Sequence, residues 1–443
     1  MLSMNARAVF EGKKITVLGL GLLGRGVGDA RYLAEQGAEL IITDLKTAEQ
    51  LAPSIAQLAD FPTITYTLGE HRVEDFKGRD FILKAAGVPD PSEYLDMARS
   101  AGIPIKMSAS WFAEISGIQC VGSTGTRGKT TVTYMIHSIL ERAGIPTLLG
   151  GNIRGISTLA LLDEVTPEHV AVLELDSWQC QGWGEAKMSP HIAVFTTFFP
   201  DHLNYYKNDL GTYLEDKAKL FLHQEAQDTL VLGAQCAEII EEKYGEKIQA
   251  HVVKVGAHDI REDWTLQVPG EHNRYDAALA IEATRALSIE DEDIRNALAA
   301  FKGVPGRLEK IREVNGISIY NDTTATTPEA TSAALEALDP TEQKNIILIM
   351  GGADKGLVMS GLLDLLPKHA KRILLLSGTG TNQILPMIAD ASVYDSLSGA
   401  TTEAFRYATE GDVILFSPAF ASFGMFTNEY DRGDQFNELV ARL

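Results

Sequence analysis

Short runs of β-branched and aliphatic residues recur along this chain and alternate with longer amphipathic stretches. The alternation is typical of parallel α/β units, in which a helix follows each strand and covers the sheet. Many of the runs pass directly into Gly, Ser, Asp or Thr, and open α/β sheets bind ligands in the loops after such strand ends. The clearest strands are expected at Ile15–Leu20, Leu40–Thr43, Ile118–Val121, His169–Leu173, Ile192–Thr196, Ile317–Tyr320, Asn345–Met350, Arg372–Leu376 and Asp412–Phe416.

The chain is long enough for several such units. Its 443 residues correspond to roughly three domains of about 150 residues, each able to bury its own core. Loop-like segments fall near Pro104–Ser110 and near Gly303–Gly306. We therefore expect three α/β domains, at 1–108, 109–303 and 304–443.

Charge and composition narrow the partners. The chain carries 39 Lys and Arg against 60 Asp and Glu, a formal net charge of −21, which repels nucleic acid and anionic membranes. No apolar run approaches the ~18 residues of a membrane span, and residues 1–14 lack a long apolar segment. Three scattered cysteines form neither a disulfide framework nor a zinc signature. We expect a reduced, cytoplasmic protein without a nucleic-acid, membrane or obligate protein partner.

The first expected strand runs into a glycine motif, Gly19-Leu20-Gly21-Leu22-Leu23-Gly24, and a second strand ends at Asp44. This is the spacing of the dinucleotide fingerprint, in which loop amides and a helix N-terminus face a pyrophosphate. The motif is weak alone, because any diphosphate ligand exploits the same geometry and a glycine turn can simply pack strand against helix. A nucleotide diphosphate is favoured here, and a nicotinamide cofactor has to be considered.

A sharper motif follows the strand at Ile118–Val121. The segment Gly122-Ser123-Thr124-Gly125-Thr126-Arg127-Gly128-Lys129-Thr130-Thr131 precedes a helix, as in a phosphate-binding loop. In such a loop Lys129 reaches the β- and γ-phosphates, and Thr130 offers a hydroxyl to Mg²⁺. The strict motif has glycine where this chain has Ser123, but the order of strand, glycines, Lys-Thr and helix is kept.

Two more strand ends carry metal-ligating side chains. Glu174 follows the strand at His169–Leu173, where a carboxylate can hold Mg²⁺ beside a phosphate loop. Asp201 and His202 follow the strand at Ile192–Thr196 and could bind a metal or a substrate. A solvated acid or a structural histidine would occupy the same positions, so the residues alone leave both interpretations open.

Lys217 falls on the apolar face of an expected helix at Leu210–Leu222. Tyr213, Leu214, Leu220 and Phe221 share this face by helical spacing, whereas Asp216 and Lys219 are expected to point away from it. A lysine in this position often extends its ammonium group to water. Alternatively, desolvation lowers its pKa and leaves a neutral amine that can take up CO₂ to form a carbamate.

Taken together, these segments resemble the Mur ligase family over essentially the whole chain. The family's phosphate loop TGTNGKT appears as Thr124–Thr130 with Arg127 in place of Asn. The other matching segments of the first two thirds of the chain are Gly150-Gly151-Asn152, Glu174–Gln179, Asp201-His202, the helix with Lys217, and Gly270-Glu271-His272-Asn273. The matching segments of the last third are Gly303–Arg307, Tyr320–Thr326, Gly351–Lys355 and Ser417–Phe423.

The resemblance implies a Rossmann-like N-terminal domain, a central P-loop ATPase-like domain with a mostly parallel sheet, and a C-terminal Rossmann-like α/β domain. It also implies ATP-dependent addition of glutamate, in its D form, to UDP-N-acetylmuramoyl-L-alanine through an acyl phosphate, in peptidoglycan precursor synthesis. The resemblance further implies that ATP is a co-substrate, that two Mg²⁺ ions take part, and that Lys217 is carbamylated.

Residue roles follow from the same resemblance. The implied catalytic residues are Lys129, His202, Lys217 and Lys355. ATP binding is implied for Gly125, Thr126, Gly128, Lys129, Thr130, Thr131, Asn273, Arg307 and Asp322. The UDP-linked substrate is implied to bind Leu22, Leu23, Asp44, Gly87, Asn152, Gln179 and His202. Glutamate is implied to bind Thr326, Lys355 and Ser422, and metal to bind Thr130, Glu174, His202 and Lys217.

Several positions depart from the family pattern. Thr324 replaces a lysine, Gly306 a histidine, Asp276 an asparagine and Asp176 a serine. Because some of these positions touch the amino-acid site, L-glutamate or another acidic amino acid is an alternative substrate.

Three other functions compete with this one. A folylpolyglutamate synthetase-like ligase would lack the N-terminal α/β domain, and a nicotinamide-dependent oxidoreductase would leave the loop of Lys129 unexplained. The third is a non-catalytic nucleotide-binding homologue, which the departures from the family pattern motivate.

Overall fold

The computed structural model describes residues 6–22, 24–388 and 390–442, and these residues form three β-sheets in two compact units. One unit holds the chain up to Ile260 together with Asp276–Ala297, and the other holds Arg261–Tyr275 and Leu298 onward. All the runs predicted as strands form strands, and each sheet falls within one of the three predicted domain ranges, whose boundaries stay a prediction.

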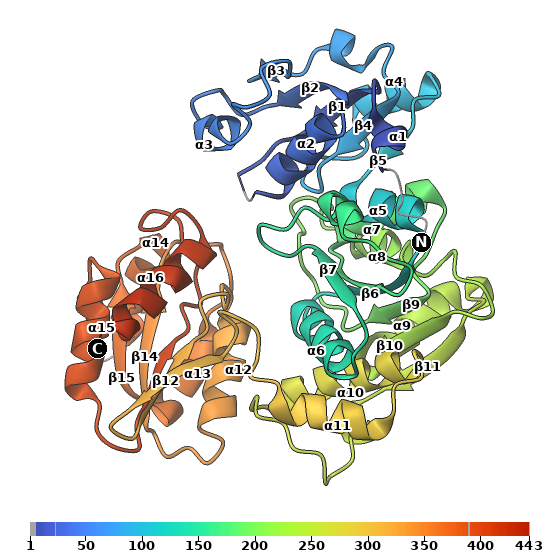
Figure 1. The fold of residues 1–443 in the computed structure, drawn as a ribbon. Coiled ribbons are helices and arrows are strands. Elements are labelled where there is room, and N and C mark those ends of the chain that lie inside the picture. The colour runs from blue at the N-terminus through green and yellow to red at the C-terminus, as the bar shows by residue number, and fades with distance from the viewer. Residues whose placement is uncertain (1–5, 23, 389, 443) are drawn as a thin grey trace. The chain divides into compact units, whose positions relative to one another are not determined.

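The first sheet is wholly parallel, with strand order β3-β2-β1-β4-β5. Its strands are β1 (Lys14–Leu18), β2 (Glu39–Asp44), β3 (Thr65–Leu68), β4 (Phe81–Lys84) and β5 (Ile105–Lys106), and its helices are α1 (Ala6–Phe10), α2 (Arg25–Glu35), α3 (Ala52–Ala56) and α4 (Glu93–Ser100) (Figure 1). β1 ends earlier than predicted because Gly19, at φ 90°, turns the chain out of the sheet. The chain winds from β1 toward β3 and then returns to β4, so a topological switch point lies between β1 and β4.

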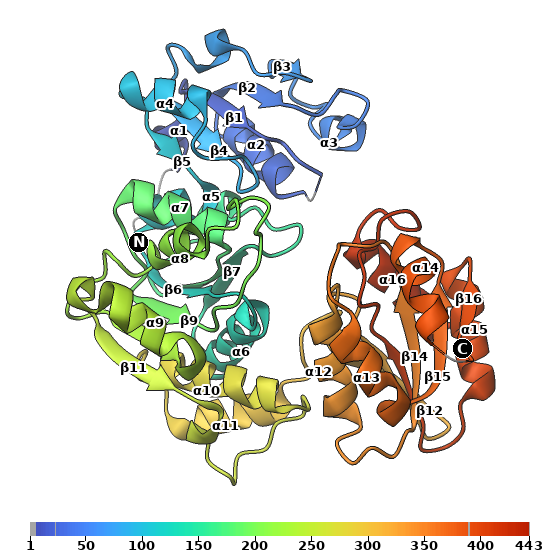
Figure 2. The same cartoon turned by 180° about the vertical axis from the view of Figure 1, so that it is seen from behind.

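The second sheet is also parallel, with order β11-β10-β9-β6-β8-β7. Its strands are β6 (Gln119–Thr124), β7 (Thr147–Gly151), β8 (Val170–Glu174), β9 (Ile192–Phe195), β10 (Thr229–Gly233) and β11 (His251–Val255). The helices nearby in the chain are α5 (Ser108–Ser116), α6 (Lys129–Arg142), α7 (Ser177–Ala186), α8 (Leu210–Ala218), α9 (Ala234–Tyr244), α10 (Glu271–Arg285) and α11 (Asp291–Ala300). α6 packs on β6–β8 and α9 on β10 and β11 (Figure 2).

One apolar core joins these two sheets. Buried side chains of both sheets and of their helices belong to one contiguous cluster, which includes Phe10, Tyr32, Phe112 and Trp183 on the helices. The ring of Phe10 meets Trp111 at 5.1 Å and 88°, an edge-to-face contact. Strands β4 and β5 of the first sheet contact α7, through the hydrogen bond from Lys84 to Gln181 and the packing of β5.

The third sheet makes up most of the second unit, with order β12-β13-β17-β14-β15-β16. Its strands are β12 (Glu309–Val314), β13 (Ile317–Asn321), β14 (Ile346–Gly351), β15 (Ala370–Leu376), β16 (Ser392–Tyr394) and β17 (Val413–Phe416), and only β12 runs antiparallel to its neighbour. Its helices are α12 (Pro328–Leu338), α13 (Ser360–His369), α14 (Thr379–Ile384), α15 (Leu397–Tyr407) and α16 (Glu429–Ala441).

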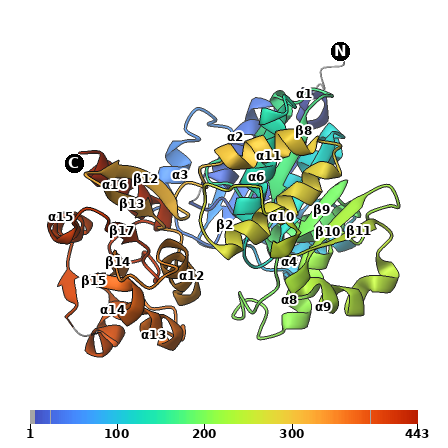
Figure 3. The ribbon, with the colours of Figure 1, turned by 90° about the horizontal axis from the view of Figure 1, so that it is seen from below.

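The side chains of β14 explain how this sheet is covered on both faces. Ile346, Leu348 and Met350 pack in the cluster that contains α12 and α13. Ile347 and Ile349 belong to the other cluster, with residues of α15 and α16. Figure 3 labels these helices and the strands of the sheet. Strand residues alternate between faces, so a continuous apolar run is what a strand buried on both sides requires.

Short 3₁₀ turns connect several elements, at Val73–Phe76, Leu159–Asp163, Gly245–Lys247, Ala257–Asp259 and Leu385–Met387. Across the part of the chain that the structure describes, no helix is both long enough and apolar enough to cross a membrane.

Candidate active site

The phosphate loop lies between β6 and α6, as predicted. Gly128 occupies the N-cap of α6 at φ 87° and supplies no side-chain cap, so the first amides of the helix face outward. The Lys129 ammonium group donates to the carbonyl oxygens of Gly125 at 3.1 Å and Thr126 at 3.2 Å. Backbone amides, a helix N-terminus and a lysine thus converge on one position, an arrangement that suits phosphate groups.

The segment after β9 holds the loop in shape. The Thr126 amide donates to the Thr197 carbonyl at 2.7 Å, and the Arg127 amide donates to the Thr197 hydroxyl at 2.9 Å. The Thr126 hydroxyl also donates to the Phe199 carbonyl at 3.1 Å. These amides are already satisfied by protein, so a phosphate would be bound mainly by the helix N-terminus, with Thr130 and Thr131 in its first turn.

Substitution of Gly128 is expected to destabilise the protein, and Gly144, beyond the other end of α6, provides a matched control. A Cβ at Gly128 would clash with the buried Asp276 carboxylate, whereas Gly144, beyond the other end of α6 at φ 76°, has nothing within 4 Å of a Cβ. We expect Gly144→Ala to lower the free energy of unfolding by about 1 kcal/mol through backbone strain. Gly128→Ala adds overpacking and should lower it by about 2–4 kcal/mol. Urea unfolding of both variants tests the difference, and equal losses would contradict it.

Lys217 lies beside the phosphate loop, on α8. Its side chain is 1% exposed, and its Nζ donates to the Gly125 carbonyl at 2.7 Å and lies 4.9 Å from the centre of the Tyr213 ring. Burial, with a further contribution from the Lys129 charge, lowers the pKa of Lys217 to about 7. The lysine does not extend to water, and its burial agrees with the second of the two sequence interpretations, a desolvated amine.

Asp216, which is expected to point away from the apolar face of this helix, is nevertheless buried and only 6% exposed. Its carboxylate accepts hydrogen bonds from Gln181 at 2.7 Å and Tyr206 at 3.0 Å and pairs with Lys219 at 2.7 Å. Helical spacing identified the apolar face of α8, but α7 packs against α8 and buries the side that carries Asp216 as well.

Glu174 ends β8 next to Ser123 of β6, so its carboxylate lies at the edge of the phosphate loop. It is buried and accepts a hydrogen bond from the Asn152 amide nitrogen at 2.9 Å. Asn152 also accepts a hydrogen bond from Arg25, in the helix that follows the glycine motif. Two predicted site residues, Glu174 and Asn152, are therefore in contact.

Asp176, one of the departures from the family pattern, caps α7. Its carboxylate accepts from the Gln179 amide at 2.7 Å, and the Gln179 side-chain oxygen accepts from the Asp176 amide at 3.2 Å, which makes a capping box for α7. We expect Asp176→Ala to lower the free energy of unfolding by about 1 kcal/mol, whereas Asp176→Ser keeps a cap and costs a few tenths. Chemical denaturation measures both, and a Ser variant as unstable as the Ala variant would contradict the capping role.

His202 is half-buried in the segment between β9 and α8. Its ring lies 4.6 Å from the Trp178 ring, and its nearest acid is Asp201, with a nitrogen–oxygen distance of 4.0 Å. Burial lowers the pKa of His202, so the neutral, ligating form predominates at pH 7.

The donor set fits magnesium that arrives with a nucleotide. Mg²⁺ favours oxygen ligands and is often held by one or two carboxylates plus substrate phosphates. Thr130 and Glu174 supply such oxygens at the phosphate loop. No cluster of three or more His, Cys, Asp or Glu side chains able to hold a metal occurs in the described residues.

A cavity of about 550 Å³ lies at the strand ends of the first sheet. Four of the predicted substrate-binding residues line it: Leu22, Asp44, Gly87 and Gln179. Asn152 and His202 are not among its lining residues, and Leu23 lies outside the described residues. Asp44 shapes the glycine loop, because its Oδ2 accepts from the amides of Leu20 at 2.9 Å and Gly21 at 3.2 Å.

The second unit carries the predicted amino-acid site at three neighbouring strand ends. Thr326 follows β13, Lys355 follows β14 and Ser422 follows β17. The Lys355 ammonium group donates to the Thr326 hydroxyl at 2.9 Å, and Ser422 is buried nearby in the fold, after the bridge between Ala353 and Ala421.

The predicted ATP-binding residues of this unit are each anchored locally. Asp322 accepts from the Ser417 hydroxyl at 2.7 Å and the Leu308 amide at 3.0 Å, next in sequence to Arg307. Burial raises the pKa of Asp322 to about 7. The Asn273 side chain donates to the Pro269 carbonyl at 2.6 Å.

Sequence reasoning missed Lys84, Gln181 and Thr197. Thr197 follows a predicted strand, so its position at a strand end was a usable signal. Lys84 also ends a strand, but β4 is only four residues long and was not predicted.

Comparisons with known proteins agree with this architecture. The Mur ligase middle domain matches residues 124–301, and the Mur ligase glutamate ligase domain matches residues 306–420. The UDP-N-acetylmuramoylalanine–D-glutamate ligase of Roseiflexus sp. is 35% identical over 97% of this chain and 98% of its own, and the enzyme of that name from Borreliella burgdorferi strain B31 is 34% identical over 96% and 97%.

A solved structure supports the fold. The MurF ligase from Thermotoga maritima in complex with ADP is 17% identical, with a TM-score of 0.61 over 99% of this chain and 98% of that one. The predicted fold class is confirmed. The chain belongs to the Mur ligase family and is an ATP-dependent, amide-bond-forming ligase.

Proposed function

We propose that the chain adds D-glutamate to UDP-N-acetylmuramoyl-L-alanine in the cytoplasm, through an acyl phosphate, in peptidoglycan precursor synthesis. The names of its full-length relatives support the substrates. The observation that carries the chemistry is the buried Lys217 amine, 2.7 Å from the Gly125 carbonyl of the phosphate loop. A regulator that only bound nucleotide would have no use for a desolvated amine at this position.

The reaction proceeds in two steps. A carboxylate oxygen of the UDP-linked substrate attacks the γ-phosphorus of ATP, and the bond to the bridging oxygen breaks to release ADP. The glutamate amine then attacks the acyl carbon, loses a proton and expels phosphate. Lys129 and the amides of α6 stabilise charge on the transferring phosphoryl group, and Arg307 is the second cation for this role.

Glutamate binding falls to the second unit. Lys355 supplies a positive charge for a carboxylate, and the hydroxyls of Thr326 and Ser422 supply directed hydrogen bonds. The contact between Lys355 and Thr326 holds the ammonium group in place before the substrate binds.

Two magnesium ions would neutralise the repulsion between ATP and the carboxylate substrate. Thr130 and Glu174 are the proposed protein ligands of one ion, and His202 and a carbamylated Lys217 those of the other. To form the carbamate, the neutral Lys217 nitrogen attacks the carbon of CO₂, a C–N bond forms and the amine proton passes to solvent. The carbamate carries a negative charge that can bind a metal ion, whereas the unmodified lysine carries no negative charge.

Phosphate release from Mg-ATP, measured with UDP-N-acetylmuramoyl-L-alanine and either D- or L-glutamate, tests the proposal. We expect release that depends on D-glutamate. Release with L-glutamate alone would keep the ligase chemistry and overturn the substrate assignment. No release with either enantiomer would favour the non-catalytic homologue.

A further inference from the structure

Lys84 is a buried cation in the wall of the 550 Å³ cavity. It is the last residue of β4, its side chain is 2% exposed, and it lines the cavity together with Gly21 and Arg25. Its Nζ donates to the Gln181 side-chain oxygen at 3.0 Å. That acceptor is a neutral amide, so the hydrogen bond does not neutralise the ammonium charge, and two of its three N–H donors remain for a ligand or water.

The geometry around Gln181 fixes which way its amide points. The Gln181 nitrogen donates to the Asp216 carboxylate at 2.7 Å, on the side opposite Lys84. A carboxylate accepts hydrogen bonds and an ammonium group donates them, so only one orientation of the amide satisfies both neighbours. Gln181 therefore keeps its oxygen toward Lys84 and holds the ammonium group in one position.

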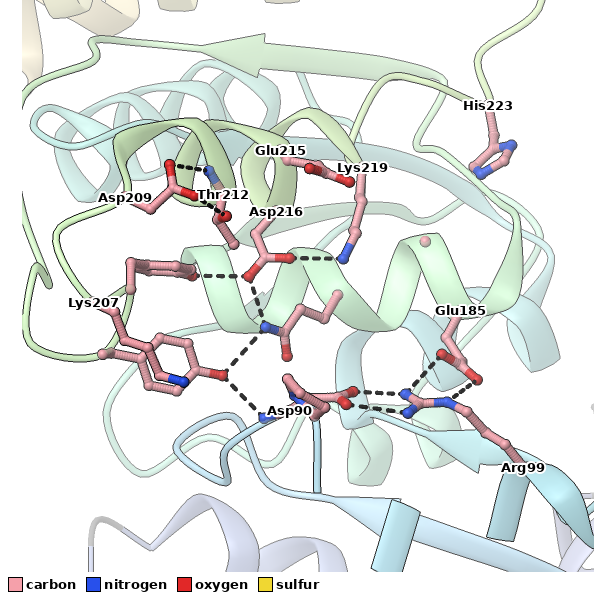
Figure 4. Close-up of a pocket in the computed structure, with 15 residues that line it drawn as sticks. Asp90, Arg99, Glu185, Lys207, Asp209, Thr212, Glu215, Asp216, Lys219 and His223 are labelled. Carbon is pink, nitrogen blue, oxygen red and sulfur yellow. Dashed lines mark hydrogen bonds and ion pairs between the residues drawn. The ribbon is translucent and has the colours of Figure 1, made fainter. Parts of the chain in front are cut away.

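Asp216 anchors this arrangement from a second, polar pocket of about 670 Å³. Figure 4 shows its carboxylate at the centre of a set of contacts with Lys219, a tyrosine hydroxyl and an amide nitrogen. Lys219 balances its charge at 2.7 Å, so Asp216 can orient Gln181 without cancelling the positive charge of Lys84. The chain of contacts thus runs from the outer pocket through α7 to the inner cavity.

The position of Lys84 in the sheet points to an anionic ligand. β4 neighbours β1 across the topological switch point, so Lys84 lies at the strand end beside the one that leads into the glycine motif. The acids that line the cavity are already engaged by the protein. Asp44 accepts loop amides, Asp29 accepts the hydroxyls of Ser108 and Ser157, and Asp176 caps α7. Their donors are neutral and leave the carboxylate charges in place, but the oxygens of these acids are occupied, so the hydrogen-bond donors left for a ligand in the cavity wall come from its cations and from the amides of α2.

We propose that Lys84 binds the diphosphate of the UDP-linked substrate, and that Gln181 and Asp216 are positioning residues that aim its ammonium group. The inference rests on the proposed function for the identity of the ligand. A diphosphate suits this site because its several oxygens can accept from the ammonium group and from the N-terminus of α2 together.

Binding of UDP and of uridine to the full chain, measured by titration calorimetry, tests the proposal. We expect Lys84→Met, which keeps the aliphatic length, to weaken UDP binding about ten- to a hundredfold and to leave uridine binding unchanged. Gln181→Met should weaken UDP binding less, and the double variant no more than Lys84→Met alone, because Gln181 acts through Lys84. Lys77→Met, an exposed lysine outside the cavity, is the control and should bind UDP like the unmodified protein.

Two results would overturn the proposal. One is unchanged UDP binding by Lys84→Met, and the other is an equal loss of UDP and uridine binding, which would make Lys84 a residue that only supports the cavity. The ligation assay separates this inference from the proposed function. Wild-type protein that binds UDP but releases no phosphate would refute the ligase proposal, whereas active wild-type protein with a Lys84→Met variant that binds UDP normally would refute the role of Lys84.

Discussion

Lys129→Ala is expected to lower kcat for phosphate release by about a thousandfold. The Lys129 ammonium group is held by two loop carbonyls, so it is aimed at the phosphate position before ATP binds. Such a preorganised charge acts most strongly on the transferring phosphoryl group, where negative charge redistributes in the transition state. A lost charge of this kind should therefore affect kcat more than the KM for glutamate.

Arg142→Ala is the matched control, because Arg142 is an exposed cation at the other end of the same helix. Its kcat should stay within twofold of the unmodified enzyme, an estimate typical of surface charges outside a site. Full ATP-dependent ligation by Lys129→Ala would show that the phosphate loop has been assigned wrongly.

The second large effect is expected at Lys217. Lys217→Met keeps the buried aliphatic stem but cannot form a carbamate, and we expect it to lower kcat about a hundredfold or more, since one metal would lose a ligand. Because burial lowers the pKa of Lys217 to about 7, the amine is mostly neutral above pH 7 and mostly protonated below it. Only the neutral amine attacks CO₂, so carbamate formation and activity should rise together as the pH increases through 7.

Lys217→Arg separates the carbamate from a purely cationic role. Arginine keeps a positive charge but cannot be carbamylated, so it should be as inactive as the Met variant. Carbon NMR with ¹³C-bicarbonate should show a carbamate signal in the unmodified protein and none in either variant. An unmodified Lys217 amine in excess bicarbonate, or an active Lys217→Arg variant, would contradict the carbamate proposal.

Local patterns predicted much of this fold because strands buried on both faces leave an uninterrupted apolar run. β14, with every residue buried, was identified from that run. β12 was not, because it is an edge strand with charged side chains, Glu-Lys-Ile-Arg-Glu-Val, and none of its residues is buried. β12 is defined by its pairing with β13, and its own composition does not indicate a strand.

The same distinction separates the site residues. The phosphate loop could be predicted because strand, glycines, lysine and helix follow one another within a short stretch. Lys84, Gln181 and Asp216 are separated by 97 and 35 residues along the chain, and none belongs to a motif. Helix packing brings them together. Helical spacing directed Asp216 away from the apolar face of α8, but it did not show that α7 also buries that side of the helix.

Gly306 and Thr324 both depart from the family pattern, and the structure places them in contact. The Thr324 amide and hydroxyl both donate to the Gly306 carbonyl, at 3.1 Å and 2.9 Å. A Cβ at Gly306, which sits at φ 70°, would lie 2.9 Å from the Thr323 methyl group. Histidine at position 306 would crowd this loop, and lysine at position 324 would lose the hydroxyl bond while keeping the amide bond. Because the two positions touch, we expect the stability effects of exchanging them to be non-additive, so the order in which the two residues change would matter.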